Sequence, residues 1–384
     1  MIIKPAKRLE NVGEYYFSTK LKEISELNEQ GKVIINLGIG SPDLAPPQVV
    51  VNALKTASND LTKHAYQSYT GLLELREAIA AFYAEHYTVS LDAANEILPL
   101  MGSKEGIMHI SMAFLNAGDA VLVPNPGYIT YAATARLLDA TPIYYNLEAA
   151  NNWLPDFVAL EKLDLTKVKI MWVNYPHMPT GAKATKAIFE KLIHFAKKHK
   201  ILLVNDNPYS FILNTQKPQS ILGIKGSNEV ALELNSLSKT FNMSGWRLGM
   251  LLGKSSYITS VLQVKSNMDS GMFYGIQQGA IAALSSPQSW YDNQNEIYKK
   301  RREIVWKILD KLNCNYVKDQ VGLFIWAKIP KETTVNKLCD YLLYKKAVFV
   351  TPGHIFGTNG NTYIRVSLCV SIEKLNEVLK RISL

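Results

Sequence analysis

The strongest constraint on the fold of this 384-residue chain is a series of short apolar segments that alternate with amphipathic helical patterns. Nearly every residue within these segments is apolar, and the helical pattern at residues 186–199 keeps its apolar side chains on one face. Strands that are apolar on both faces are typical of a parallel sheet with helices on each side. We therefore predict an α/β fold with a mostly parallel sheet sandwiched by helices. The apolar segments are residues 97–101, 120–123, 168–173, 201–204 and 230–234.

After residue 255 the pattern changes. Residues 255–284 and 292–312 are helical in pattern, and short strands and two further helices follow them. Strands and helices in this arrangement are typical of a smaller α+β domain. We predict a large domain at residues 46–280 and a small domain that combines residues 1–45 with residues 281–384.

Composition and charge exclude several classes of protein. The net charge is +9, but the basic residues are spread along the chain and no basic motif with interleaved aromatic residues is found, so we expect no nucleic-acid partner. A basic balance also suits anionic small molecules. The histidines show no metal-ligand spacing, and we expect no metal site.

The cellular compartment is suggested by cysteine usage and by hydropathy. Cys314, Cys339 and Cys369 are far apart and form no CxxC pair, which is typical of a reducing compartment. No apolar run reaches transmembrane length, and the first residues contain no apolar core of a signal peptide. We expect a cytoplasmic protein without a membrane partner.

Polar side chains follow the ends of four of the predicted strands. Tyr128, Asn174, Asp206 and Lys239 each come within a few residues of an apolar segment. Ligands of parallel α/β sheets bind outside the carboxyl ends of the strands. We expect these four residues to meet in one site.

Lys239 lies among further groups that bind anions. Ser236 precedes it by three positions, Ser238 is its neighbour and Arg247 follows by eight. A desolvated lysine near a fixed cation is kept partly neutral, which makes it a good Schiff-base nucleophile. Hydroxyls and a guanidinium are donors that a phosphate needs. A second anion site is predicted at a helix start formed by Gly102, Ser103 and Lys104.

Together these groups match the needs of one cofactor. A lysine forms an imine with an aldehyde, a carboxylate keeps a pyridine nitrogen protonated, a flat aromatic residue stacks on the ring, and the phosphate donors hold a phosphate. We therefore predict pyridoxal 5′-phosphate. Each group by itself also suits a surface loop or a helix cap.

Several separate motifs resemble those of one known family. The segments are Ser236-Leu-Ser-Lys239, Ser-Gly-Trp-Arg247, Pro-Gly-Tyr128 and Tyr-Ile-Arg365-Val-Ser, and the likeness runs from about Gly38 to Arg365. The chain resembles the class I/II aminotransferases, which are fold type I pyridoxal-phosphate enzymes like aspartate aminotransferase.

The resemblance implies a role for each matched residue around the cofactor. Lys239 carries the Schiff base and moves the proton, Asp206 pairs with the pyridine nitrogen, and Tyr209 bonds the ring phenolate. Tyr128 stacks on the ring. Asn174 is a further cofactor-binding candidate. The residues assigned to the phosphate are Gly102, Ser103, Lys104, Ser236, Ser238 and Arg247.

The resemblance also implies roles for three residues on the substrate and partner sides. Arg365 clamps the substrate α-carboxylate as a bidentate fork. Gly40 lets the substrate approach the backbone. Tyr66 reaches the phosphate of a neighbouring subunit, so we expect a homodimer with shared active sites.

One motif departs from the family pattern. The family sequence Asn-Pro-Thr-Gly is Met178-Pro-Thr-Gly181 here, so a thioether replaces an amide. A thioether cannot donate a hydrogen bond. We therefore assign Met178 no polar contact with the ring.

The predicted function is pyridoxal-phosphate-dependent transfer of an amino group between an L-amino acid and a 2-oxo acid, with ping-pong kinetics through Lys239. A carbon–sulfur β-lyase of the same fold shares nearly all of these residues and remains an alternative. A cofactor-binding regulator is a second one, but residues 1–30 leave no room for a DNA-binding domain. The motifs do not specify the amino acid.

Overall fold

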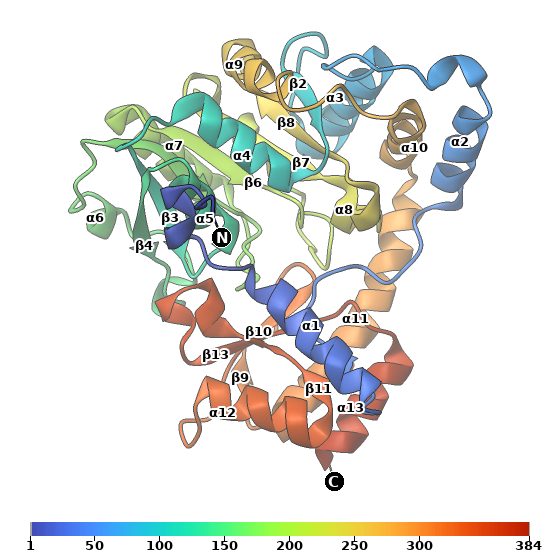
Figure 1. Cartoon of the computed structure of the whole chain (residues 1–384), viewed down its shortest axis with the longest axis vertical. Helices are drawn as coiled ribbons and strands as arrows, with labels where there is room; N and C mark the ends of the chain where they lie inside the picture. Colours follow the sequence, from blue (N-terminus) through green and yellow to red (C-terminus); the bar gives the residue numbers. More distant parts are fainter. Residues whose placement is uncertain (1, 384) are drawn as a thin grey trace.

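A seven-stranded sheet forms the centre of the large lobe in the computed structural model, which describes residues 2–383 (Figure 1). The strand order is β2-β8-β7-β6-β5-β3-β4. Only β8 runs against its neighbours, and the other pairs are parallel. The predicted α/β fold with a mostly parallel sheet is therefore confirmed. The strands are β2 (Ile97–Leu100), β3 (Ala120–Asn125), β4 (Thr141–Asn146), β5 (Val168–Val173), β6 (Leu202–Asp206), β7 (Ala231–Ser236) and β8 (Gly249–Gly253).

Two of these strands, β4 and β8, are absent from the sequence-based prediction. β4 lies at the edge of the sheet, and its side chains are mostly exposed or half-buried, so it has no continuous apolar run. β8 is buried, but it is short and has a glycine at each end, which is a turn signal in a sequence. Their positions depend on the neighbouring strands.

Helices cover both faces of this sheet, as the apolar strands require. Along β3, Val121 and Val123 pack into one core while Ala120 and Leu122 pack into the other. The helices of the first core are α4 (Ser103–Phe114), α5 (Ile129–Leu137) and α9 (Ser255–Lys265). The helices on the opposite face are α6 (Phe157–Leu160) and α7 (Lys186–His199), and then α2 (Gln48–Ser58), α3 (Leu73–Tyr87) and α10 (Tyr274–Leu284) near β2 and β8.

The small lobe is built around an antiparallel sheet of order β12-β13-β10-β9 and a separate pair of parallel strands, β1 with β11. The long helix α11 (Gln288–Lys311) connects the two lobes (Figure 1). The other elements are β1 (Ile35–Asn36), β9 (Asn315–Tyr316), β10 (Phe324–Lys328), β11 (Val348–Phe349), β12 (Thr351–Pro352), β13 (Tyr363–Ser367), α1 (Tyr16–Glu29), α12 (Val335–Asp340) and α13 (Ile372–Ser383).

The pairing of β1 with β11 joins the N-terminal segment to the C-terminal part of the chain. This contact supports the proposed grouping of residues 1–45 with residues 281–384, and the boundary positions themselves stay a prediction. The first turn of the chain lies beside α5 of the large lobe, where Arg8 donates a hydrogen bond to the Leu137 carbonyl (Figure 1). The N-terminal segment therefore crosses from one lobe to the other.

Across residues 2–383, none of the helices combines the length and the apolar character that a membrane crossing requires.

The close packing of α4 on the sheet gives a test of this fold. Gly106 lies in α4, and a Cβ atom there would be 2.6 Å from Leu100 Cδ1 and 2.7 Å from Leu234 Cδ2. Gly106→Val should therefore lower the free energy of unfolding by about 1–3 kcal/mol through overpacking. Thermal unfolding measures the effect, and Gly13→Val is the control because nothing lies within 4 Å of its added Cβ. Equal melting temperatures for Gly106→Val and the wild type would contradict the packing.

Candidate active site

A cavity of about 510 Å³ lies between the two lobes, at the carboxyl ends of β5, β6 and β7. Most of the residues predicted from the sequence line this one cavity, although they come from both lobes. They are Gly40, Ser103, Lys104, Tyr128, Asn174, Asp206, Tyr209, Ser236, Ser238, Lys239, Arg247 and Arg365. Gly102 and Tyr66 are the two predicted site residues that do not line it.

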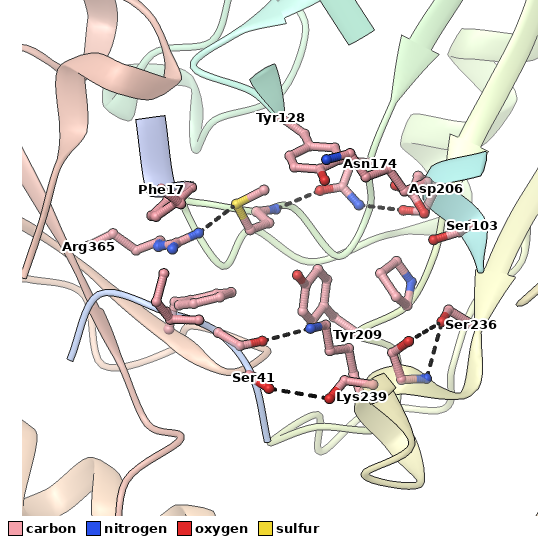
Figure 2. A pocket seen from close by; sticks show the side chains of 18 of the residues that line it. Phe17, Ser41, Ser103, Tyr128, Asn174, Asp206, Tyr209, Ser236, Lys239 and Arg365 are labelled. Atoms are coloured by element: carbon pink, nitrogen blue, oxygen red, sulfur yellow. Dashed lines mark hydrogen bonds between the residues drawn. The ribbon is translucent and has the colours of Figure 1, made fainter. Parts of the chain in front are cut away.

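Lys239 lies in the short helix α8 (Leu237–Thr240), which begins directly after β7. Its ammonium donates a hydrogen bond of 2.6 Å to the Gly40 carbonyl across the cavity (Figure 2). Burial lowers the pKa of this amine, and the positive charges of Arg365 and Arg247 lower it further. The amine is thus poised to lose its proton more readily than an ordinary lysine.

Asp206 is the last residue of β6 and is 6% exposed. Its Oδ2 accepts a hydrogen bond of 2.9 Å from the Tyr131 hydroxyl, while Oδ1 is buried without a hydrogen-bond partner among residues 2–383. Burial raises the pKa of this carboxyl to about 6. The Asn174 amide donates to the Asp206 backbone carbonyl and thereby joins the ends of β5 and β6 (Figure 2).

A group of hydrogen-bond donors occupies the other end of the cavity. The Ser236 hydroxyl caps α8 and lies 2.8 Å from the Ser238 hydroxyl (Figure 2). Arg247 has φ 52° and donates to the Ser244 carbonyl. A Cβ atom at Gly102 would be 2.0 Å from Arg247 Nη2, so only glycine leaves room for the guanidinium at the start of α4.

Arg365 reaches the cavity from β13 of the small lobe and is 4% exposed. Its Nη2 donates a hydrogen bond of 2.7 Å to the Gly38 carbonyl, and its Nε has no partner among the residues described. The guanidinium carbon lies 3.9 Å from the ring centre of Phe324 and 4.7 Å from that of Phe356. Burial lowers its pKa to about 10, which still leaves it charged at neutral pH.

Met178 occupies a buried position beside Arg365. Its sulfur accepts a hydrogen bond of 3.2 Å from Arg365 Nη1, and its backbone N–H donates to Asn174 Oδ1 at 2.9 Å (Figure 2). The neighbouring His177 is buried, which lowers its pKa to about 3 and keeps it neutral. The departure from the family motif therefore places a weak acceptor where an amide is usual.

Tyr66 lies outside the cavity of its own chain and is 91% exposed. It belongs to the loop that precedes α3. Its predicted contact is with a neighbouring subunit, so this assignment stays a prediction.

Sequence reasoning missed part of the cavity wall. Tyr15 and Phe17 come from the N-terminal segment, where the aromatic run at residues 15–17 of an otherwise polar stretch was an available signal. Phe324 and Phe356 come from the small lobe and carry no motif that points to a site. The further lining residues are Leu21, Ile39, Ser41, Met178, Pro208 and Ser244.

Away from this cavity, Glu105, His109 and Asp269 have possible metal-ligand atoms within 4.8 Å of one another. The ammonium of Lys265 lies 2.8 Å from Asp269 and already neutralises it. His109 Nε2 is hydrogen-bonded to Glu105 at 3.0 Å. We interpret this group as a partly buried cluster held by the Lys265–Asp269 ion pair and the His109–Glu105 hydrogen bond.

The family model for class I and II aminotransferases matches residues 32–382. The chain belongs to this family. It therefore uses pyridoxal 5′-phosphate to move an amino group between an amino acid and a 2-oxo acid, on the fold type I scaffold. The prediction of a transferase in amino acid metabolism is confirmed, and the β-lyase and regulator alternatives gain no support.

Similar proteins match over nearly their whole length. The chain is 40% identical over 380 residues to the LL-diaminopimelate aminotransferase of Oleidesulfovibrio alaskensis, with 98% of each chain covered. It is 38% identical over 376 residues to that of Aquifex aeolicus, with 98% of this chain and 97% of the relative covered. The solved structure of substrate-bound BacF from Bacillus subtilis has a TM-score of 0.94 at 38% identity, with 100% of this chain and 98% of BacF covered.

The cavity fits the cofactor that the family requires. Asp206 Oδ1 is a buried carboxylate oxygen without a partner among the residues described, which suits a protonated ring nitrogen. Lys239 faces the same cavity with a lowered pKa, and the start of α4 next to Arg247 suits a phosphate. These three features match the ring nitrogen, the aldehyde and the phosphate of pyridoxal phosphate.

The lowered pKa of Lys239 predicts unusual reactivity in the cofactor-free protein. An amine with a lowered pKa is neutral at lower pH, so trace labelling with acetic anhydride should modify Lys239 at a pH below the usual lysine range. Peptide mass spectrometry across a pH series measures the labelling, and the exposed Lys331 serves as an internal reference for the reagent. Labelling of Lys239 with a midpoint at or above that of an ordinary lysine would contradict the effect of burial.

Proposed function

We propose that Lys239, Asp206 and Arg365 carry out transamination in this cavity, with Lys239 as the catalytic base. The observation that carries this proposal is that three groups line one cavity. They are a lysine with a lowered pKa, a buried carboxylate with one oxygen that has no hydrogen-bond partner among the residues described, and a buried arginine. When bound, pyridoxal phosphate supplies a protonated ring that takes up the electron pair left at the substrate Cα. The side chains of the protein transfer the proton and bind the ring, the phosphate and the substrate carboxylate.

Lys239 moves the proton in this proposal. Its neutral amine removes the proton from the substrate Cα and returns it to the carbon on the other side of the substrate nitrogen. A lowered pKa makes that neutral amine available at a lower pH than for an ordinary lysine. Asp206 holds a proton on the ring nitrogen through Oδ1. Tyr128 and Tyr209 line the same cavity, and in this proposal Tyr128 stacks on the ring and Tyr209 bonds its phenolate.

The phosphate is held at the opposite end of the cavity from Arg365. Ser236, Ser238 and Arg247 supply the donors there, together with the first turn of α4 at Ser103. Charge-assisted hydrogen bonds from a guanidinium are strong and suit a dianion.

Arg365 binds the substrate α-carboxylate. Its burial against Phe324 fixes the guanidinium plane, and the contact with the Gly38 carbonyl orients it. Arg365→Lys should weaken every amino acid substrate, because an ammonium cannot form the two-pronged contact. The expected loss in kcat/KM corresponds to about 2–5 kcal/mol. Steady-state kinetics with several donors measures it, and an unchanged kcat/KM for all donors would remove Arg365 from the site.

We further propose LL-diaminopimelate as the amino donor. The support is the printed name of the relatives that are 37–40% identical over nearly the whole chain. A donor panel with 2-oxoglutarate, pyruvate and oxaloacetate as acceptors tests it, with Lys239→Ala as the blank. Stoichiometric appearance of glutamate from LL-diaminopimelate is the expected result. Turnover of other amino acids without LL-diaminopimelate would reject this donor, and pyruvate with ammonia from cystathionine would point to β-lyase activity.

The active form in this proposal is a homodimer with shared sites. Support comes from large apolar side chains that are exposed on two segments, the loop before α3 and the loop after α9. In the first, Leu61 is 88% and Tyr66 is 91% exposed, and in the second, Met268 is 59% exposed. The two segments touch, since a Cβ atom at Gly271 would lie 2.4 Å from the Gln67 carbonyl oxygen. A second copy covering this surface buries it and brings Tyr66 to the neighbouring cavity.

Hybrid dimers test the shared site. Tyr66→Phe chains keep Lys239, and Lys239→Ala chains keep Tyr66, so a mixed dimer has one site that is free of both changes. After dissociation and reassociation, the mixture should be more active than the sum of its parents in the donor assay. Reassociated wild-type chains provide the control for recovery. No gain over the parents, or a fully active monomer in sedimentation, would contradict the shared site.

We place the protein in the cytoplasm. The three cysteines, Cys314, Cys339 and Cys369, are all free thiols, which suits a reducing compartment.

A further inference from the structure

A second buried carboxylate lies within β7, on the face of the sheet opposite to the Asp206 side chain. Glu233 is fully buried, and it pairs in register with Asn205 of β6. Successive side chains of a strand point to opposite faces, so Asn205 and Asn207 share the face of Glu233 while Asp206 points to the other. None of the steps proposed above uses Glu233.

Four hydrogen-bond donors surround the Glu233 carboxylate. Its Oε1 accepts from the Tyr83 hydroxyl at 2.9 Å and from Asn207 Nδ2 at 3.3 Å. Its Oε2 accepts from Asn205 Nδ2 at 3.1 Å and from the Ile221 backbone N–H at 3.1 Å. Each of these contacts requires an acceptor, and an ionised carboxylate is an acceptor at both oxygens. Burial raises the pKa of this carboxyl, and the hydrogen bonds from Asn205, the Ile221 N–H and Tyr83 act against that rise, so the four donors favour the negatively charged form.

These contacts lead directly to the active-site strand ends. Asn205 and Asn207 are the neighbours of Asp206 on either side. Asn205 Oδ1 also accepts from the Tyr175 backbone N–H at 3.0 Å, one residue after Asn174 at the end of β5.

A second path runs from Glu233 to the turn that carries Lys239. The Tyr83 hydroxyl accepts from Asn235 Nδ2 at 2.9 Å, and Asn235 Oδ1 accepts from the Ser236 backbone N–H at 2.8 Å. The Glu233 carboxylate is thus hydrogen-bonded, directly or through one side chain, to the ends of β5, β6 and β7.

The charge of Glu233 is not matched by a cation. Across residues 2–383 it takes part in no ion pair. Burying a carboxylate without a cationic partner is costly, and replacing it with an apolar residue would remove that cost. Stability by itself does not account for a charge at this place.

We propose that Glu233 is a positioning residue for the ring-binding carboxylate: it holds Asp206 in place through Asn205 and Asn207, and its negative charge strengthens the hold of Asp206 on a proton. The proposal rests on the proposed pairing of Asp206 with the cofactor ring. A carboxylate with a second negative charge behind it binds a shared proton more tightly. A more firmly protonated ring is a better electron sink.

Other titratable groups around the two carboxylates do not compete for this role. Burial raises the pKa of every tyrosine among them, so none of these hydroxyls ionises near neutral pH. Lys239 is the only cation in the group, and its charge acts on Asp206 in the opposite sense to that of Glu233. The groups are Tyr83 and Tyr87 of α3, Tyr131 of α5, Tyr128, Tyr209 and Lys239.

The test is the affinity of the cofactor-free protein for pyridoxal phosphate, measured by absorbance titration across a pH series. The series is repeated in a Lys239→Ala background, where no imine forms and the titration of Lys239 is removed, so that loss of affinity in acid reports protonation of Asp206. The titrations of the cofactor itself are common to all variants. Glu233→Gln removes the negative charge, so Asp206 stays ionised to lower pH. The acid midpoint should move down by about 0.5 unit. The affinity near neutral pH should fall about tenfold, as expected for the loss of one to two hydrogen bonds.

Two further variants keep the test decisive. Tyr83→Phe removes the shortest bond to Glu233 without touching the cavity, so the neutral acid forms more readily and the midpoint should move in the same direction by less. This variant carries the test if Glu233→Gln does not fold. Ser227→Ala is the matched control, because it removes a partly buried hydrogen bond from a buried serine to the Leu222 carbonyl, away from the cavity. Its affinity and midpoint should equal those of the wild type.

The outcomes separate Glu233 from Asp206. A midpoint at the wild-type value in a folded Glu233→Gln or Tyr83→Phe protein overturns the proposal, whatever happens to the affinity. Asp206→Ala should weaken the binding of pyridoxal phosphate and abolish the midpoint. Wild-type affinity and midpoint in Asp206→Ala would show instead that the proposed role of Asp206 is wrong.

Discussion

The site depends on the parallel backbone ladder that joins β5, β6 and β7. Val173 pairs with Asn205, and Asp206 pairs with Leu234, so the three strands end at nearly the same level. Because parallel strands share one direction, the residues that follow their carboxyl ends emerge at one edge of the sheet. A slip of one residue would turn Asp206 toward the opposite face. The meeting of Asn174, Asp206 and Lys239 is therefore a consequence of strand register.

The charges brought to this edge are buried, and backbone carbonyls of one loop accept bonds from two of them. The Gly38 carbonyl accepts from Arg365, and the Gly40 carbonyl accepts from Lys239. The loop is held from behind by Asp43, which forms a two-pronged ion pair of 2.6 and 2.9 Å with Arg301 of α11. Bidentate pairs of this kind fix geometry as well as charge. The long helix between the lobes thus helps to shape the cavity.

The two buried carboxylates Asp206 and Glu233 differ in how fully their oxygens are hydrogen-bonded. Asp206 keeps one oxygen without a partner among the residues described, whereas the oxygens of Glu233 are fully engaged by four donors. An unsatisfied buried carboxylate oxygen is costly and points to a missing partner, while a satisfied one points to a fixed structural position. This contrast distinguishes Asp206, the proposed ring-binding residue, from Glu233, the proposed positioning residue, although the two lie on adjacent strands.

The sequence alone determined the α/β fold, most of the helices and most of the strands, because apolar periodicity is a local property of the chain. The helices α5 and α6 are not among those that it predicted. It also indicated the motifs around Lys239, Asp206 and Arg365, because each motif is a short run of neighbouring residues that is visible without the fold. The edge strand β4 and the glycine-bounded strand β8 needed the tertiary structure, because only their neighbours show that they pair.

The tertiary structure alone decided which distant segments complete the site. Phe17, Phe324 and Phe356 surround Arg365 from the N-terminal segment and the small lobe. No motif marks Phe324 or Phe356, and the aromatic run at residues 15–17 does not show that Phe17 packs against Arg365. Glu233 looks like a single polar interruption of an apolar strand in the sequence. Its four donors come from β6, from Asn207 directly after β6, from α3 and from the backbone at Ile221. Long-range contacts of this kind depend on how the lobes and strands pack, and chain-local periodicity carries no information about that packing.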